Sequence, residues 1–178
     1  MFKTTSRWLF VALLFVPSVA AAQEPGDVGV FMGYPSLGLV WQVSEKVAIR
    51  PEISFSSTST EIDSPFSGTG TSHNWNVKVG ASALLYLNDA DRLRTYVAPQ
   101  FTYVRTSGES SSGLSEFVAN TYGFAGLFGA QYSLNDRFSV FGELGIGYTH
   151  ASTGDRIPTA SKSDNWGTRT AVGVILYF

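Results

Sequence analysis

The segment Asp164–Phe178 reads DNWGTRTAVGVILYF, and its side chains alternate between two faces with a period of two residues. One face carries Trp166, Thr168, Thr170, Val172, Val174, Leu176 and Phe178. The other face carries Gly167, Arg169, Ala171, Gly173, Ile175 and Tyr177. A period of two residues is that of a β-strand. A strand with an apolar face toward lipid and small or polar side chains toward a lumen is typical of a transmembrane β-barrel.

The composition agrees with apolar residues that are dispersed along strands. Hydrophobic residues make up 44% of the 178 residues, yet no apolar run after Val19 is long enough for a membrane helix. Aromatic residues, at 14%, suit strands and interfacial girdles. The absence of cysteine excludes disulfides and thiol-linked lipids. A formal net charge of −2 without a basic cluster gives no indication of nucleic-acid binding.

The first 22 residues are expected to be a secretory signal peptide. Lys3 and Arg7 give a basic start, an apolar run follows, and Ala20–Ala22 offers small residues for cleavage. We therefore expect residues 1–22 to be removed and residues 23–178 to form one barrel domain.

Seven more alternating segments precede the last one. The predicted strands are about 27–34, 37–43, 47–58, 74–87, 93–106, 117–134, 137–151 and 164–178. Short turns alternate with three long connections rich in Ser, Thr and Gly, which are expected to be external loops: Ser59–His73, Ser107–Glu116 and Ser152–Ser163. This asymmetry is typical of outer-membrane barrels. The sequence thus predicts an all-β fold, an eight-stranded antiparallel transmembrane β-barrel with up-and-down meander topology.

Two prolines lie inside predicted strands and leave the facing of those strands open by one residue. Pro51 and Pro99 cannot donate to the ladder, so each removes an inter-strand hydrogen bond or marks a bulge.

Charged and amide side chains share the inward parity of their strands. The charged ones are Arg50, Glu52, Lys78, Glu143 and Arg169, and the amides are Gln42, Gln100 and Gln131. An eight-stranded barrel has room only for its own side chains or a small ligand, and charges in a narrow lumen are costly unless they pair. These points favour a lumen plugged by salt bridges. The alternative is a narrow polar pore, or a lumen gated by rearranged pairs.

The strand pattern and the ending Gly173–Phe178 resemble the small outer-membrane β-barrel superfamily of OmpA-, OmpX- and OmpW-like proteins. The resemblance implies a location in the outer membrane of a Gram-negative bacterium, with outer-membrane lipid, lipopolysaccharide and the barrel-assembly machinery as partners. It also implies that four outward residues form a C-terminal assembly signal: Val172, Val174, Leu176 and Phe178. The resemblance says little about activity; we expect no cofactor and a structural, surface-contact or narrow-pore (porin-like) role, with the external ligand left open.

One group of three residues, a histidine, a serine and an aspartate, has the side-chain types that catalyse acyl transfer. His150 and Ser152 lie two apart, hence on one face with Cα atoms about 7 Å apart, and Asp164 opens the neighbouring strand. A serine with a histidine base and an orienting acid is the general arrangement of a serine hydrolase. By contrast, His73 and His150 lack the set spacing to carboxylates that defines a metal site.

This group of three residues resembles the lipid A deacylase family, whose barrels carry a His-x-Ser motif on the penultimate strand. The resemblance implies that His150 is the base, that Ser152 is the nucleophile and that Asp164 has the role of the family's acidic residue. The chain departs from the family at Thr153–Gly154, where the family has Asn-Ala, and the family's acid is usually Glu. We therefore expect a non-enzymatic barrel, with an outer-membrane acyl hydrolase as the alternative.

Overall fold

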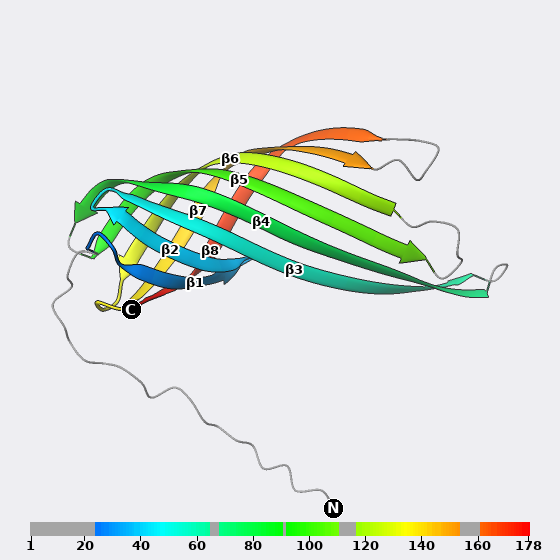
Figure 1. Cartoon of the computed structure of the whole chain (residues 1–178), viewed down its shortest axis with the longest axis horizontal. Helices are drawn as coiled ribbons and strands as arrows, with labels where there is room; N and C mark the ends of the chain where they lie inside the picture. The colour runs from blue at the N-terminus through cyan, green and yellow to red at the C-terminus, as the bar shows by residue number, and fades with distance from the viewer. Residues whose placement is uncertain (1–23, 65–67, 91, 111–116, 154–160) are drawn as a thin grey trace, which may run out of the picture.

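A computed structural model of the chain describes residues 24–64, 68–90, 92–110, 117–153 and 161–178. The strands are β1 Val28–Tyr34, β2 Leu37–Ser44, β3 Val47–Ser64, β4 Gly68–Ala90, β5 Leu93–Ser110, β6 Phe117–Ser133, β7 Phe138–Thr153 and β8 Lys162–Tyr177. Each strand pairs antiparallel with the next, and β1 pairs with β8 to close the barrel (Figure 1). The predicted eight-stranded meander is confirmed. The predicted signal peptide lies outside the described residues.

No helix in the described part of the chain is long and apolar enough to span a membrane.

The prediction that Ser59–His73 is a loop is wrong. Ser59–Ser64 continues β3 and Gly68–His73 begins β4, and the two segments pair residue for residue from Ser59↔His73 to Ser64↔Gly68. These segments have no apolar face, which is the pattern that predicted the other strands. Backbone pairing does not require an apolar face once a hairpin extends into water, and threonine has a high β-propensity.

The other two predicted loops also begin or end within strands. Ser107–Ser110 belongs to β5, Ser152 and Thr153 end β7, and Lys162 and Ser163 begin β8. The rest of these connections lies at residues 111–116 and 154–160, outside the described residues, apart from Ser161.

Neither proline shifts the facing of its strand. Pro51 pairs with Ala81 in an uninterrupted ladder to β4, and Pro99 pairs with Gly126 in an uninterrupted ladder to β6. On the opposite side of each strand, the ladder is interrupted beside the proline and resumes in the same register. Each proline therefore removes ladder bonds on one side only, which is the less disruptive of the two expectations.

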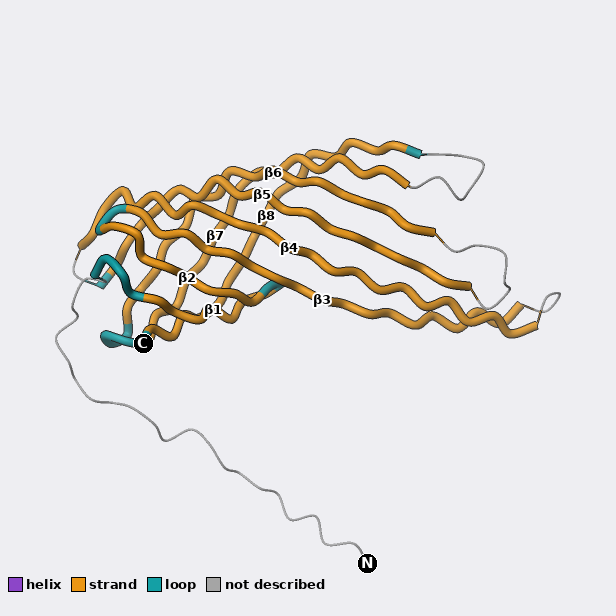
Figure 2. The backbone as a smooth tube through the Cα atoms, viewed as in Figure 1, coloured by secondary structure: helices purple, strands orange, loops and turns teal. Residues whose placement is uncertain are grey.

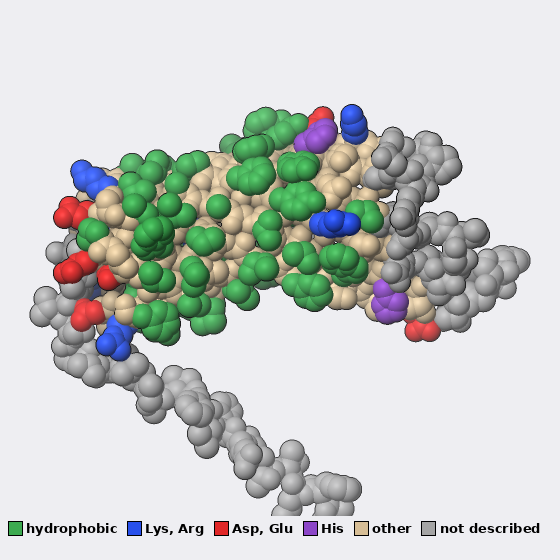
Figure 3. Space-filling model, in the orientation of Figure 1, with side chains coloured by type: hydrophobic (Ala, Val, Ile, Leu, Met, Phe, Trp, Pro, Cys, Tyr) green, Lys and Arg blue, Asp and Glu red, His purple; other side chains and the backbone are tan. Residues whose placement is uncertain are grey.

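The exterior carries a broad apolar belt (Figure 3), in which most large hydrophobic side chains on outward positions are exposed. Tyr122 and Tyr132 mark its two edges on β6. Ten residues at about 3.3 Å each, tilted by roughly 40°, span about 25 Å, which is the height of a lipid-facing band. At one edge, ring pairs join neighbouring strands: Tyr103 with Tyr122 at 5.2 Å, and Tyr148 with Trp166 at 5.3 Å between centroids. The belt thus has the dimensions and the aromatic border of a membrane span.

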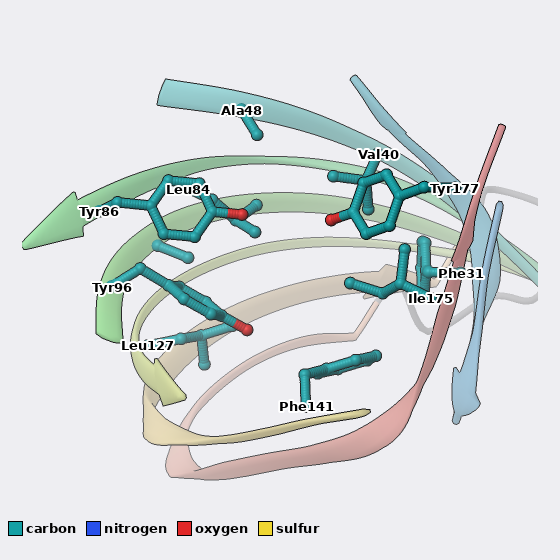
Figure 4. Packing of buried hydrophobic residues seen from close by; sticks show 11 residues of the cluster. Phe31, Val40, Ala48, Leu84, Tyr86, Tyr96, Leu127, Phe141, Ile175 and Tyr177 are labelled. Atoms are coloured by element: carbon teal, nitrogen blue, oxygen red, sulfur yellow. The ribbon is translucent and has the colours of Figure 1, made fainter. Parts of the chain in front are cut away.

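The core lies inside the barrel, in the half where β1 and β2 complete the wall. Its buried side chains point toward one another across the lumen (Figure 4). They are Phe31, Val40, Ala48, Leu84, Tyr86, Tyr96, Ala98, Leu127, Phe141, Ile175 and Tyr177. Gly129 makes room for one of them, because a Cβ at this position would collide with the ring of Tyr96. This half of the lumen is therefore filled by the barrel's own side chains.

Candidate functional site

A buried ion pair crosses the lumen at the level of the core. Arg50 of β3 donates to Glu143 of β7 through two hydrogen bonds, Nη1 to Oε1 at 2.7 Å and Nη2 to Oε2 at 3.0 Å. The two side chains are 2% and 1% exposed. Tyr96 donates its hydroxyl to Glu143 Oε1 at 2.7 Å. The bidentate geometry and the additional donor compensate for the loss of hydration of the two ions.

Two aromatic rings flank the Arg50 guanidinium. Its central carbon lies 5.3 Å from the ring centroid of Phe31 and 5.6 Å from that of Phe141. These rings exclude water from the pair and attract the cation through their π faces.

A second ion pair lies beside the first. Lys78 Nζ is 2.9 Å from Glu52 Oε1. Glu52 also accepts hydrogen bonds from Gln100 Nε2 at 3.2 Å and from Ser36 Oγ at 3.3 Å. The Glu52 side chain is 2% exposed and Lys78 is 20% exposed, so this pair borders the open part of the lumen.

Arg169 is the fifth charge that the sequence places on the inner face, and it differs from the other four. It lines the lumen cavity but is exposed, and its guanidinium forms no hydrogen bond or ion pair with any described residue. Its stem lies against Gly147, where a Cβ would lie 2.9 Å from Arg169 Nε and 3.1 Å from its Cγ. The structure thus brings four of the five predicted charges into pairs and leaves Arg169 uncompensated.

A polar layer closes the lumen on the other side of the core. Gln131 accepts a hydrogen bond from the Tyr86 hydroxyl at 3.2 Å and donates to the Tyr177 hydroxyl at 3.1 Å. Arg94 lies over the ring of Tyr86 at 3.6 Å and donates to the carbonyl of Glu45 at 2.7 Å. Arg94 is 3% exposed. Arg94 was not among the inward charges predicted from the sequence, although it shares the inward parity of Tyr96.

Above the plugged half the lumen opens into a cavity of about 270 Å³. Its lining includes both ion pairs, Arg169, several threonines and the turn between β1 and β2. The barrel is thus filled on one side of the Arg50–Glu143 pair and hollow on the other.

The candidate catalytic residues lie at the outer rim, where His150 and Asp164 follow two residues beyond the Tyr148–Trp166 ring pair. His150 Nδ1 is 2.7 Å from Asp164 Oδ1, and the Tyr148 hydroxyl donates to the same oxygen at 2.6 Å. These bonds, the one from Tyr148 above all, lower the pKa of the Asp164 carboxyl. Ser152 lies two residues farther along β7, opposite Lys162, and its hydroxyl forms no hydrogen bond with His150 or with any other described residue. The histidine–acid half of the arrangement is present, and the serine–histidine bond is not.

The proposed C-terminal signal faces outward. Val172 and Phe178 are 63% and 76% exposed, and Leu176 is 38% exposed. Val174 shares their parity. No group of three possible metal ligands occurs among the residues that the structure describes.

No protein-family model and no curated protein matches the sequence. Among solved structures, the chain is similar to a major outer membrane protein from Thermus thermophilus, with a TM-score of 0.56 and 14% identity. The match covers 85% of this chain and 98% of that one. The chain has the fold of the small outer-membrane β-barrel proteins. Together with the apolar belt, this fold confirms the prediction of an eight-stranded transmembrane β-barrel.

Two further structures are similar at a lower level. Acinetobacter baumannii CarO and CarO2 match with 15% and 14% identity, each at a TM-score of 0.40. The matches cover 86% and 87% of this chain and 98% and 99% of the others. These scores add nothing to the fold assignment, which rests on the Thermus protein and on the closed strand order.

Proposed function

We propose that this outer-membrane barrel is a non-conducting scaffold that acts in surface contact. The observation that carries the proposal is the layer formed by Arg50, Glu143 and Tyr96, which joins β3, β7 and β5 across the lumen with nearly complete burial. A solute would have to break a buried bidentate ion pair to pass this layer, which is strongly unfavourable.

The outer half supplies the contact surface. The hairpin of β3 and β4 extends beyond the apolar belt, and its outward positions Ser57 and Ser59 are exposed and polar. Exposed hairpins on a rigid scaffold are the usual place for recognition. Lipopolysaccharide and membrane lipid around the belt, and the assembly machinery during insertion, are the partners that we propose.

Planar-bilayer recording tests the proposal. Purified barrel that shows heat-modifiable gel mobility, and is therefore folded, is expected to insert without conductance steps. Glu143→Ala, which removes one half of the plug, provides the comparison. Stable steps from the wild-type barrel would contradict the scaffold and support the narrow polar pore.

A second candidate function is acyl hydrolysis at the outer rim. The observation that favours it is the 2.7 Å contact between His150 and Asp164, which would hold the imidazole as a base on the face that Ser152 shares. Mass spectrometry of lipid A from cells that express the wild type or Ser152→Ala tests it, with Ser161→Ala as a nearby control. Loss of an acyl chain only when Ser152 is intact would establish this activity, and identical acyl patterns would exclude it.

A further inference from the structure

The barrel wall is incomplete beside the β1–β2 turn. β1 and β2 have 7 and 8 residues, whereas the other strands have 16 to 23. The last pair between β1 and β8 is Tyr34↔Val172, and the last between β2 and β3 is Leu37↔Ile53. Beyond these pairs, β3 and β8 continue past the ends of β1 and β2 (Figure 2). We call this opening the side gap, bordered by Ser54–Ser64 and Lys162–Ala171.

The side gap begins within the height of the apolar belt. Trp166, at the outer edge of the belt, lies six residues from Val172 on β8, which corresponds to about 15 Å along the membrane normal. Leu144 and Ile146 of the neighbouring β7 are each 63% exposed over this height. The lower part of the gap therefore faces the outer leaflet of the membrane sideways.

Unpaired strand edges do not tolerate contact with hydrocarbon. The backbone N–H and C=O groups of β3 and β8 that point into the gap have no ladder partner among the described residues. In lipid, such groups are tolerated only where they line water or meet polar atoms. The gap thus requires a polar occupant at a depth where the surroundings are apolar.

The lumen cavity reaches this gap. Its lining contains Tyr34 and Ser36 from the turn below the gap and Lys78 and Arg169 from the interior. It also contains Thr170, which has the outward parity of β8. The cavity therefore extends from the interior of the barrel to its outer surface at the β8 edge.

The cavity carries one uncompensated positive charge. Its lining holds three cations, Arg50, Lys78 and Arg169, and two carboxylates, Glu52 and Glu143. The carboxylates pair with Arg50 and Lys78, which leaves Arg169 with no acidic partner in the described chain. An anionic group at this point would gain an ion pair and would supply oxygen acceptors to the threonine hydroxyls around it.

We propose that the side gap admits a single-chain anionic amphiphile from the outer leaflet, with its carboxylate or phosphate at Arg169 and its alkyl chain in the membrane. A cavity of about 270 Å³ suits a headgroup and the first methylenes of a chain. Tyr34 and Phe55, which are 80% and 69% exposed at the margins of the gap, offer apolar contact to the chain. The inference rests on the proposed scaffold, because the plugged half forms the floor of the cavity.

Photolabelling in vesicles tests the inference. The full barrel is refolded into phosphatidylcholine vesicles with palmitate that carries a diazirine on its chain, and mass spectrometry maps the labelled residues. Label is expected at Tyr34, Phe55 and Thr170 in excess of Phe124, which is 59% exposed on β6 away from the gap. Hexadecanol with the same diazirine, which lacks the charge, is expected to label the belt evenly.

Two arginine variants distinguish binding in the cavity from a general attraction of the anion to positive charge on the barrel. Arg169→Gln is expected to lower the label at the gap about tenfold, equivalent to about 1.4 kcal/mol. Arg105→Gln is the matched control, because Arg105 is exposed on the outward face of β5, and it is expected to leave the label unchanged. If Arg169→Gln does not fold, Gly147→Ala replaces it, since the new Cβ displaces the Arg169 side chain.

Three results would overturn the inference. Palmitate label spread evenly over the belt would show that the gap is not a binding site. Displacement of the label by inorganic phosphate at equal concentration would identify a water-borne anion as the ligand. Cross-links between two copies along β3 and β8, without palmitate label, would assign the gap to a dimer. Conductance of the wild-type barrel counts against the proposed scaffold instead, so the two failures are distinguishable.

Discussion

Arg50 and Glu143 lie on opposite walls of the barrel, 93 residues apart in the sequence, and two hydrogen bonds of 2.7 and 3.0 Å join them. β3 and β7 are four strands apart in a ring of eight, so the pair spans the lumen. The same contact fixes the shape of the lower half and forms the floor of the outer cavity.

Removal of one partner of this pair is expected to be strongly destabilising. Glu143→Ala leaves a buried guanidinium without its carboxylate and should lower the free energy of unfolding by about 3–5 kcal/mol. The double variant Arg50→Met, Glu143→Leu should lose much less, because no buried charge remains. Urea unfolding in lipid vesicles measures both, and a Glu143→Ala barrel as stable as the wild type would contradict the buried pair.

A charge in the middle of the apolar belt is expected to oppose insertion. Leu144 is 63% exposed on the outer face, and Leu144→Arg should cost about 2–4 kcal/mol of stability in a bilayer. Ser59→Arg is the matched control, because Ser59 shares the outward parity of β3 but lies beyond the belt. Equal stabilities of the two variants would show that the belt does not contact the hydrocarbon of the bilayer.

The extended hairpin is expected to be dispensable for the barrel. Among the described residues, Ser59–Ser64 and Gly68–His73 pair only with each other and with the outer end of β5. Replacement of this segment by a two-residue Asn-Gly turn should leave heat-modifiable mobility and the urea midpoint nearly unchanged. A shortened chain that no longer folds would show that the hairpin supports the wall beside the side gap.

The C-terminal phenylalanine is expected to matter for assembly in cells more than for stability. Phe178→Ser should lower the amount of folded barrel in the outer membrane severalfold, while refolding into detergent remains efficient. Phe124→Ser, which removes an exposed phenylalanine from the belt outside the terminal strand, controls for lost lipid contact. Equal yields of folded barrel from the Phe178→Ser and Phe124→Ser variants in cells would contradict the proposed assembly signal.

Much of the architecture could be predicted from side-chain alternation. A period of two residues assigns each side chain of a strand to the lumen or to lipid, so the inward parity of Arg50 and Glu143 follows directly. Their partnership does not, because it depends on the closure of β1 against β8 and on the register accumulated across several strands. Arg169 shows the same limit, since its parity was predictable and its lack of a partner was not.

Two features of the outer half could not be predicted from apolar patterning. The polar ends of β3 and β4 have no apolar face, so they were interpreted as a loop although their backbones pair. The side gap arises because β1 and β2 end before β8 and β3, and the predicted boundary of β3 hid about half of the difference in length between β2 and β3.

The most direct test of a barrel built for a membrane is folding of residues 23–178, the mature chain that we propose, with and without lipid. With phospholipid vesicles, we predict a β-sheet circular dichroism spectrum and a heat-modifiable band on gels. In buffer without lipid or detergent, we predict aggregation. A folded monomer in that buffer, seen by sedimentation and circular dichroism, would contradict the account, because the apolar belt would then have no hydrocarbon to face.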